Sequence, residues 1–476
     1  MKDLQPLKKP RSATGDLALP TKTTLSLGDS TFSKQISGLL RRRSIPCDIG
    51  LLSESLLDEE HLTVTDFQSV SKLADETSFD ELLTNIRSQA NSNASPLIFC
   101  PLDTSVDDEH QRWSVKMAAL RAYGATLFFD VRVWIEAMVI ALKHGTPESA
   151  SIAIVAPKDS VLFYEARGHI HWTKRRRPRL AMKNSELEHH PSDVVFYDPS
   201  ISPSQDFDGL ALPISPAYDP GNPSHLLGLK DCIQAIEILA EAQLRLTSQL
   251  GRSKGHETEW DEPRLKKQLN QCGTEIGDHE TKVMLSCFTI PVTRQALAST
   301  PSAASRLAKK AGYPVDLKPW GPEQPSEKDG CLVELNIDSA ADVRRAYTSV
   351  CNWGETETAI VRAAPPKGRE CSIELLHHED LGWFIECKIE GVNPSLSLVA
   401  PASRVDAKRI AQKMVSTRQT DHEPNVNAMV ELLVSLSRMP EKIPTLKSIS
   451  CPRVLIGSDS HQVMVIDASS SLETSS

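Results

Sequence analysis

The fold is decided by one stretch of the chain, Ala311-Gly312-Tyr313-Pro314-Val315-Asp316-Leu317-Lys318-Pro319. Its Gly-Tyr-Pro segment predicts a turn, and the turn leads into a short apolar strand that ends in a single lysine, Lys318. A strand can hold a lysine ammonium rigidly over a phosphate, as nucleotide-binding folds require, whereas a loop would let it move. The stretch therefore makes Lys318 a candidate nucleotide-binding residue, with an ordinary solvated lysine as the alternative.

Composition limits the classes of protein to which the chain can belong. Its 476 residues are enough for two to four domains, and a hydrophobic content of 40% with 24% charged residues is ordinary for a globular protein. The net charge of −9 does not favour nucleic acid or an anionic membrane as a partner. No apolar run approaches the ~20 residues of a membrane span. The ten cysteines form no C-x-x-C pair, which favours reduced thiols and a cytoplasmic protein.

Strand-like and helix-like patterns alternate along the first half of the chain. Such an alternation predicts parallel sheets covered by helices. The expected strands are 24–27, 48–52, 96–100, 125–129, 151–155, 193–197 and 209–214, and the expected helices between them include 79–90 and 131–144. The domain boundaries that follow are 1–20 and 471–476 for disordered tails, 21–147 and 148–250 for two α/β domains, 251–263 for a polar linker, and 264–470 for a third domain. In the third domain, Thr300-Pro301-Ser302 is expected to cap one helix, and Asp338 or Ser339 is expected to cap another.

From about residue 21 to residue 470 the chain resembles the nucleoside-diphosphate-forming acyl-CoA synthetases, the acetyl-CoA and succinyl-CoA ligase relatives. The segments Ala118–Val155 and Leu210–Ala242 are similar to their flavodoxin-type domains. Lys282–Pro291 and Ala303–Lys318 look like the entry to their ATP-grasp domain. The resemblance implies an α/β fold with two succinyl-CoA-synthetase-like, flavodoxin-type parallel-sheet domains followed by an ATP-grasp domain. The CoA-binding domain that comes first in the family has no counterpart, so the chain is expected to start after it.

Two further segments carry the resemblance in the third domain. Gly368–Gly382 is similar to a strand pair of the family, with Glu370 at the position of an invariant acidic residue. Val463–Ala468 matches the final strand, which ends in Asp467-Ala468. The resemblance therefore implies ATP as the ligand, with Lys318 and Glu370 as nucleotide-binding residues. For Glu370, a carboxylate on the surface of a strand is the alternative.

The motifs that do chemistry in the family are replaced in this chain. Ser326 stands where a phosphate-carrying histidine is expected, and serine cannot form a labile phosphoramidate. The family's Asp-Ile-Asn-Pro becomes Ile449-Ser450-Cys451-Pro452, which removes hard oxygen ligands for magnesium. The loop that would bear a second phosphohistidine is shortened to 103–107, and the glycine-rich loop at 388–391 keeps one glycine. These departures predict no catalytic residue and no metal ligand.

Other candidate residues have ordinary explanations. The basic run at 174–179 could bind anions, but it is more simply a solvated loop. Adjacent residues of a strand point to opposite faces, so His377 and His378 cannot chelate a metal together. Arg41-Arg42-Arg43 ends a predicted helix, where cations complement the helix dipole.

The sequence is compatible with three readings of function. The first is a catalytically degenerate homologue that acts as a binding or regulatory protein on a protein partner or as a homo-oligomer, retaining nucleotide or acyl-CoA binding. The alternative is an active ATP-dependent acid-CoA ligase subunit, whose partner chain supplies the CoA-binding domain and the phosphohistidine. A scaffold without any ligand is a third reading.

Overall fold

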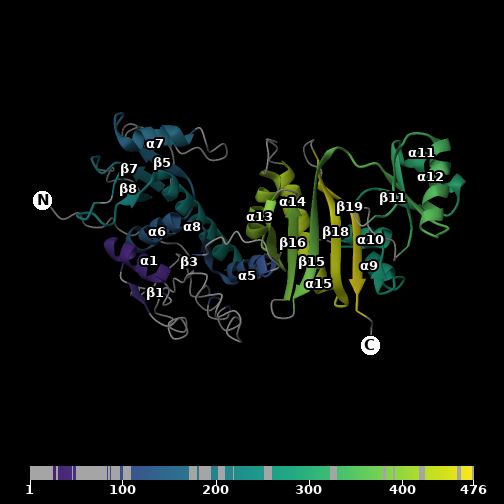
Figure 1. Ribbon diagram of the computed structural model, residues 1–476, viewed down its shortest axis with the longest axis horizontal. Coiled ribbons are helices and arrows are strands. Elements are labelled where there is room, and N and C mark those ends of the chain that lie inside the picture. The colour runs from purple at the N-terminus through teal and green to yellow at the C-terminus, as the bar shows by residue number, and fades with distance from the viewer. Residues whose placement is uncertain are drawn as a thin grey trace. The chain divides into compact units, whose positions relative to one another are not determined.

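The structure is a computed structural model that describes residues 25–27, 31–45, 47–49, 83, 86, 97–99, 109–170, 179–181, 194–201, 209–217, 219–250, 260–321, 330–378, 382–389, 392–416, 424–457 and 463–473. The chain forms two compact units (Figure 1). The first unit comprises residues 1–105 and 120–253, and the second comprises 106–119 and 254–476. Within the described ranges, every helix is too short or too polar to cross a membrane.

The first unit is built on a five-stranded parallel sheet with the strand order β6-β5-β7-β8-β9. Its main core lies between this sheet and the helices α6 and α8, and it includes the completely buried Trp134 and Phe196. The elements up to residue 250 are β1 (Leu25–Leu27), α1 (Thr31–Arg42), β2 (Cys47–Ile49), β3 (Leu97–Phe99), α5 (Glu109–Tyr123), β4 (Thr126–Phe128), α6 (Val131–Val139), the π-helix η1 (Ile140–His144), β5 (Ile152–Val155), α7 (Val161–Ile170), β6 (Arg179–Ala181), β7 (Val194–Tyr197), β8 (Leu210–Ser215), β9 (Leu226–Leu227) and α8 (Leu229–Leu250).

The strands expected from the sequence pattern are present and parallel. Besides the five-stranded sheet, β1 pairs with β2 and β3 pairs with β4, each in parallel register. An α/β fold with parallel sheets is thus confirmed for this half of the chain. Residues on both sides of position 147 belong to one compact unit, and the expected division into two flavodoxin-type domains stays a prediction.

A buried ion pair holds the first unit together, and no local pattern in the sequence indicates it. Arg43, just after α1, donates from Nη1 and Nη2 to the Glu136 carboxylate of α6 at 2.7 and 3.0 Å. The same guanidinium donates to the carbonyls of Pro223 and His225 at 3.0 and 2.8 Å. The buried Arg43 side chain therefore links the end of α1 to α6 and to the loop before β9. The helix-dipole explanation is wrong for this residue, because the Glu136 carboxylate neutralises its charge.

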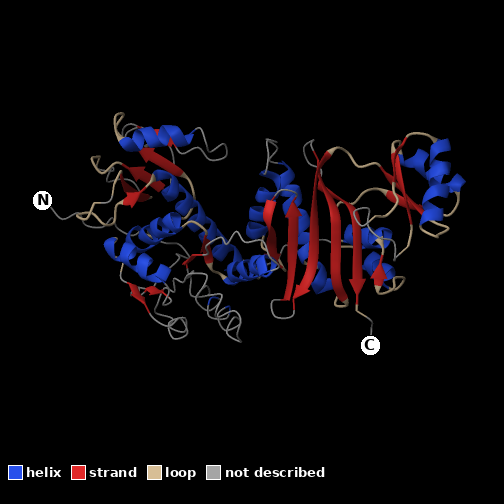
Figure 2. Ribbon diagram, viewed as in Figure 1, coloured by secondary structure: helices blue, strands red, loops and turns tan. Residues whose placement is uncertain are grey.

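The second unit contains a six-stranded antiparallel sheet with the order β10-β19-β18-β15-β16-β17 (Figure 2). Helices α9, α10, α13, α14 and α15 contribute to the apolar core against this sheet, for example through Leu265, Leu285, Met414, Leu433 and Met439. The elements of this layer are α9 (Glu262–Leu269), β10 (Glu275–Ile276), α10 (Asp278–Cys287), β15 (Gly368–His378), β16 (Gly382–Ile389), β17 (Val392–Val399), α13 (Arg404–Ser416), α14 (Pro424–Ser437), α15 (Met439–Lys442), β18 (Leu446–Gly457) and β19 (Val463–Leu472).

A second, four-stranded antiparallel sheet has the order β11-β14-β12-β13. Its elements are β11 (Gln295–Ala298), α11 (Pro301–Ala311), β12 (Val315–Pro319), β13 (Glu334–Ile337), α12 (Ala340–Trp353) and β14 (Ala359–Ala363). Helices α11 and α12 cover the side of this sheet that faces away from the six-stranded sheet (Figure 1). Both helix starts are confirmed: Thr300 accepts a hydrogen bond from the Ala303 amide, and at the second start Ser339, not Asp338, accepts one from the Asp342 amide.

The boundaries differ from the expectation at three places. The helix expected over 131–144 continues from α6 as a π-helix at Ile140–His144 and ends before Gly145, whose φ is +102°. Helix α9 begins at Glu262, inside the expected linker, with Asp261 as its N-cap. Strand β19 continues to Leu472, beyond the expected domain end at 470, because it pairs with β10 and β18 there. The helix expected over 79–90 lies almost wholly outside the described residues.

Candidate functional site

Strand β12 presents two kinds of side chain on its two faces. Val315 and Leu317 are buried in the core under α11 and α12. Asp316 and Lys318 alternate with them, so they point to the other face. All five residues of the strand are buried, and Lys318 is only 4% exposed. The predicted strand and its terminal lysine are present, but Lys318 is buried instead of solvated.

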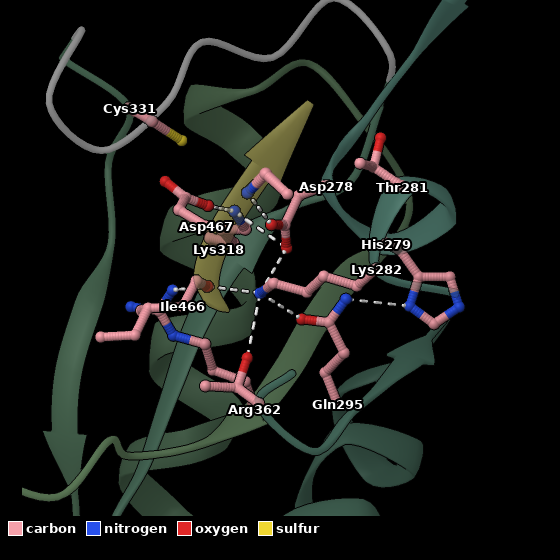
Figure 3. A network of polar contacts seen from close by, with 12 residues as sticks. Asp278, His279, Thr281, Lys282, Gln295, Lys318, Cys331, Arg362, Ile466 and Asp467 are labelled. Atoms are coloured by element: carbon pink, nitrogen blue, oxygen red, sulfur yellow. Dashed lines mark hydrogen bonds and ion pairs between the residues drawn. The ribbon is translucent and has the colours of Figure 1, made fainter. Parts of the chain in front are cut away.

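The ammonium group of Lys318 is held by two carboxylates (Figure 3). It forms an ion pair with Asp467 of β19, and a second with Asp278 Oδ2 of α10 at 3.1 Å. Asp278 also accepts a hydrogen bond from the Ala468 amide at 2.9 Å. Lys318 therefore joins the four-stranded sheet to the last strand of the six-stranded sheet.

Lys282 of α10 is the second cation of the group, and it is 1% exposed. Its Nζ donates to Asp278 Oδ2 at 3.1 Å, to Thr293 Oγ1 at 3.0 Å and to Gln295 Oε1 at 2.9 Å. It also donates to the backbone carbonyl of Ile466. These acceptors come from the helix and from both sheets, so Lys282 has more partners than its three N–H bonds can serve at once.

Arg362 of β14 completes the arrangement. Its Nε donates to Asp316 Oδ2 at 3.1 Å, and its Nη1 donates to the Ile466 carbonyl at 3.3 Å. The other oxygen of Asp316 accepts from the Asn336 amide at 2.9 Å. We call the six charged residues Asp278, Lys282, Asp316, Lys318, Arg362 and Asp467 the charge cluster.

The charge cluster is electrically balanced. Its three cations, Lys282, Lys318 and Arg362, face three carboxylates, so the formal sum of +3 and −3 is zero. Burying charges costs several kcal/mol per ion unless each is paired and hydrogen-bonded, and here the ion pairs and hydrogen bonds among the six residues supply those partners. The cations are thus neutralised from within the protein, which weakens their attraction for an added phosphate.

Two pKa values show how strongly the groups depend on one another. Burial would raise the pKa of Asp278, but the ammonium groups of Lys282 and Lys318 and the Ala468 amide outweigh it and hold the pKa well below 3.8. Burial lowers the pKa of Lys282 from 10.5 to about 8, although Asp278 opposes the change. Asp278 is therefore ionised at any ordinary pH, whereas Lys282 changes its charge near pH 8.

This pKa gives a testable pH dependence. Between about pH 8 and pH 10.5 the unfolded chain keeps the Lys282 proton and the folded chain releases it, so the contribution of Lys282 to stability rises with pH there. We expect the free energy of unfolding of the wild type to gain up to about 3 kcal/mol, relative to Lys282→Met, as the pH is raised through this window. Urea unfolding of both proteins at several pH values measures it, and parallel pH profiles would contradict the assignment.

Glu370, the second predicted nucleotide-binding residue, forms its ion pair with a residue outside the charge cluster. It sits on β15 and forms a two-pronged ion pair with Arg453 of β18, at 3.0 and 2.7 Å. The pair joins neighbouring strands of one sheet, which agrees with the structural alternative for Glu370. The structure thus brings Lys318 together with Asp467, whereas Glu370 is paired with Arg453, which stands opposite Asp467 in the register of β18 and β19.

The residues that replace the family's magnesium motif lie in the core. Ile449 and Cys451 of β18 are almost completely buried, and burial raises the pKa of the Cys451 thiol to about 12. A protonated thiol is not the hard oxygen ligand that magnesium prefers. Asp278 and Asp467 could offer oxygens, but both are paired with Lys318. Among the described residues no group of three or more His, Cys, Asp or Glu side chains is placed to hold a metal ion, and the residues present do not fit magnesium.

The thiols near the cluster should be inert at neutral pH. Cys331 lies close to Lys318, and burial raises the pKa of its thiol to about 11. Burial raises the pKa of the Cys451 thiol to about 12. Because the thiolate is the reactive form, we expect iodoacetamide to label these two cysteines at pH 7.5 at least about tenfold more slowly in the folded protein than in urea. Mass spectrometry after timed quenching measures the labelling, and equal rates in both states would contradict the burial of the two thiols.

Several sequence candidates cannot be placed. Ser326, most of the basic run at 174–179 and the loop at 103–107 lie outside the described residues. His377 is described, and its ring packs edge-on against Trp383 at a centroid distance of 5.1 Å. The residues that the sequence analysis missed are Asp278, Lys282 and Arg362. A signal for Lys282 existed, since it begins the segment that resembles the ATP-grasp entry, but no local pattern marks Asp278 or Arg362.

Comparisons with known proteins agree with the architecture of the second unit. Residues 267–472 match the ATP-grasp domain family. The beta subunit of the ADP-forming acetate–CoA ligase II of Pyrococcus furiosus is 22% identical over 222 residues, which cover 43% of this chain and 94% of that subunit. The ADP-forming acetate–CoA ligase II of Archaeoglobus fulgidus is 25% identical over 175 residues, and the 4-hydroxybutyrate–CoA ligase of Nitrosopumilus maritimus is 23% identical over 216 residues.

The extent of these likenesses is limited. The matches cover 35% and 38% of this chain, and the chain spans only 26% and 31% of the two longer ligases. Among solved structures, the acetyl-coenzyme A synthetase 1 of Ca. Korarchaeum cryptofilum, in complex with coenzyme A and Ca-AMPCP, is 25% identical with a TM-score of 0.39, covering 44% of this chain and 98% of that chain. The second unit thus carries an ATP-grasp domain, and the ligases that share it support a relationship of the chain to the nucleoside-diphosphate-forming acyl-CoA synthetases.

Proposed function

We propose that this chain is a catalytically degenerate acyl-CoA synthetase homologue that acts as a binding or regulatory protein and retains nucleotide binding. The observation that carries the proposal is the internal neutrality of the charge cluster, in which Lys318 is paired with both Asp278 and Asp467. Phosphoryl transfer depends almost entirely on positioned cations that neutralise developing charge. A lysine already shared by two carboxylates would have to exchange them for a phosphate before it could serve that chemistry.

The replaced motif supports the same proposal from a different direction. Ile449 and Cys451 stand where the resemblance implies a carboxylate and an amide; both are almost completely buried, and burial keeps the Cys451 thiol protonated. Loss of the metal ligands and of the phosphate-carrying histidine affects successive steps of one reaction. Each loss would lower a rate by orders of magnitude, so turnover would not survive their combination.

Nucleotide binding and a partner belong to the proposal as well. The match to the ATP-grasp domain family supports a nucleotide ligand, with acyl-CoA as the second candidate. A relative named as a beta subunit supports a protein partner, with a homo-oligomer as the other arrangement. None of the eight cysteines in the described ranges forms a disulfide, which agrees with a cytoplasmic protein.

Calorimetric titration of the purified chain with ATP, in the presence of magnesium and in its absence, tests the proposal. We expect binding whose affinity changes less than about threefold when magnesium is removed, because the residues do not fit a metal. Affinity that requires magnesium would contradict degeneracy of the site. Absence of binding to ATP and to acetyl-CoA would leave only a scaffold role.

One observation favours the alternative of an active ligase subunit. The chain covers 94% of the Pyrococcus beta subunit, and a ligase divided over two chains would not need every catalytic residue on one of them. This alternative requires a partner chain that carries the CoA-binding domain and the phosphohistidine. Co-purification of the tagged chain from its native source, followed by an assay for acyl-CoA formation, would decide in its favour if ligase activity follows the tag.

A further inference from the structure

We propose that the outer face of α12 is a binding site for a small phosphate-bearing anion. A shallow depression that is wide open to solvent, with a volume of about 530 Å³, lies there; we call it the cavity, and it is lined by Pro301, Arg344, Arg345, Thr348, Ser349 and Asn352. Its volume falls within the ~300–1,000 Å³ that small-molecule sites occupy. This site is distinct from the charge cluster, because it lies on the helix layer and the cluster lies on the opposite face of the four-stranded sheet.

The helical period of α12 separates a core face from the cavity face. Val343, Ala346, Tyr347 and Val350 are buried and pack in the core that also contains Val315 and Leu317 of β12. The lining residues form two rows at a spacing of four, one of Arg344, Thr348 and Asn352 and one of Arg345 and Ser349. Residues four apart are neighbours on a helix surface, so each row presents its polar groups side by side.

The lining carries two positive charges, and two carboxylates contact it from outside, Asp342 at Arg345 and Glu334 at Ser349. The Arg344 side chain is exposed and has no partner among the described residues, so all of its N–H donors are available. The Arg345 side chain is 81% exposed and is paired with Asp342 within the helix. Ser349 donates to Glu334 Oε1 at 3.1 Å and Thr348 to the Arg344 carbonyl at 3.2 Å. The donors left for a ligand are thus mainly guanidinium N–H groups and the Asn352 amide.

Guanidinium groups recognise phosphate through paired N–H bonds. Two arginines beside amide and hydroxyl groups therefore fit a phosphate better than an apolar ligand. The class of ligand that this chemistry selects is a phosphate-bearing small molecule. Because α12 packs against β12, a ligand held there rests on the helix that supports the strand carrying Lys318.

The test is a calorimetric titration of the full chain with pyrophosphate at constant ionic strength. We expect the double variant Arg344→Ala/Arg345→Ala to bind pyrophosphate at least about tenfold more weakly than the wild type. The matched control is Lys309→Ala/Lys310→Ala, which removes two exposed positive charges at the end of α11, outside the cavity, and should change the affinity less than about twofold. Both variants leave the buried face of each helix intact, and circular dichroism checks their folding.

A second variant tests the cavity without removing an arginine. Thr348→Glu places a carboxylate four residues after Arg344, where it would pair with that guanidinium, and we expect it to weaken pyrophosphate binding at least about fivefold. Equal losses in the arginine and lysine double variants would show general charge attraction and overturn the proposal. So would a wild type that does not bind millimolar pyrophosphate. Binding at the charge cluster instead would leave the affinity unchanged in the arginine variant, which also contradicts this site.

Discussion

Replacing Lys318 by methionine is expected to lower the free energy of unfolding by about 3–5 kcal/mol, because it removes one partner of a buried ion-pair group. The change leaves Asp278 and Asp467 facing each other with one cation fewer, so the buried cluster acquires a net charge of −1. Methionine has nearly the same length, which keeps a packing defect from explaining the loss. Guanidinium unfolding followed by circular dichroism measures the difference.

The control for this prediction is an exposed lysine. Lys309→Met at the end of α11 should change stability by less than about 0.5 kcal/mol, since surface substitutions away from special contacts have small effects. The double variant Lys318→Met/Asp467→Leu should recover part of the loss, because it removes both members of the pair. A Lys318→Met protein as stable as the wild type would mean that Lys318 is not committed to internal partners and is available for a ligand.

Arg43→Ala is expected to destabilise the first unit by about 3–5 kcal/mol. Arg43 and Glu136 are each 4% exposed, and truncation leaves the Glu136 carboxylate buried without its guanidinium. It also removes the donor to the Pro223 and His225 carbonyls, which fixes the loop before β9. Burial already raises the pKa of Glu136 above 4.5, so the loss should be larger at neutral pH than at pH 5, where a lone carboxyl can take up a proton.

The matched control is Arg132→Ala on the same unit. The Arg132 side chain is 74% exposed, and its nearest carboxylate oxygens lie at 3.8 and 3.9 Å, so its loss should cost less than about 1 kcal/mol. Thermal unfolding of both variants, with limited proteolysis to report on the first unit, separates them. Equal stability of Arg43→Ala and Arg132→Ala would show that the buried contacts of Arg43 contribute nothing to the free energy of unfolding.

Local signals in the sequence predict the parallel strands of the first unit and several elements of the second unit. The alternation of strand and helix patterns predicted the parallel strands of the first unit, and the side-chain oxygens of Thr300 and Ser339 predicted two helix starts. The strand at Val315–Pro319 was predicted with its lysine in place. These features depend on residues close together in the chain, so the pattern carries them directly.

The candidate site could be predicted only in part, because it is assembled from distant residues. Lys318 and Asp467 are 149 positions apart, and nothing near Lys318 indicates that a carboxylate of the last strand neutralises it. The same holds for Arg43, which stands 93 positions before Glu136 in a run of three arginines that look equivalent. Charge balance depends on which distant residues meet in the folded chain, and the hydrophobic periodicity of the sequence does not indicate it.

The most direct measurement of the central claim is acyl-CoA formation by the purified full-length chain supplied with ATP, magnesium, acetate and coenzyme A. The account predicts no acetyl-CoA above the level of a protein-free sample, together with a folded protein and measurable ATP binding in the same preparation. Magnesium-dependent formation of acetyl-CoA by the chain alone, abolished by Lys318→Met in a variant that stays folded, would contradict it.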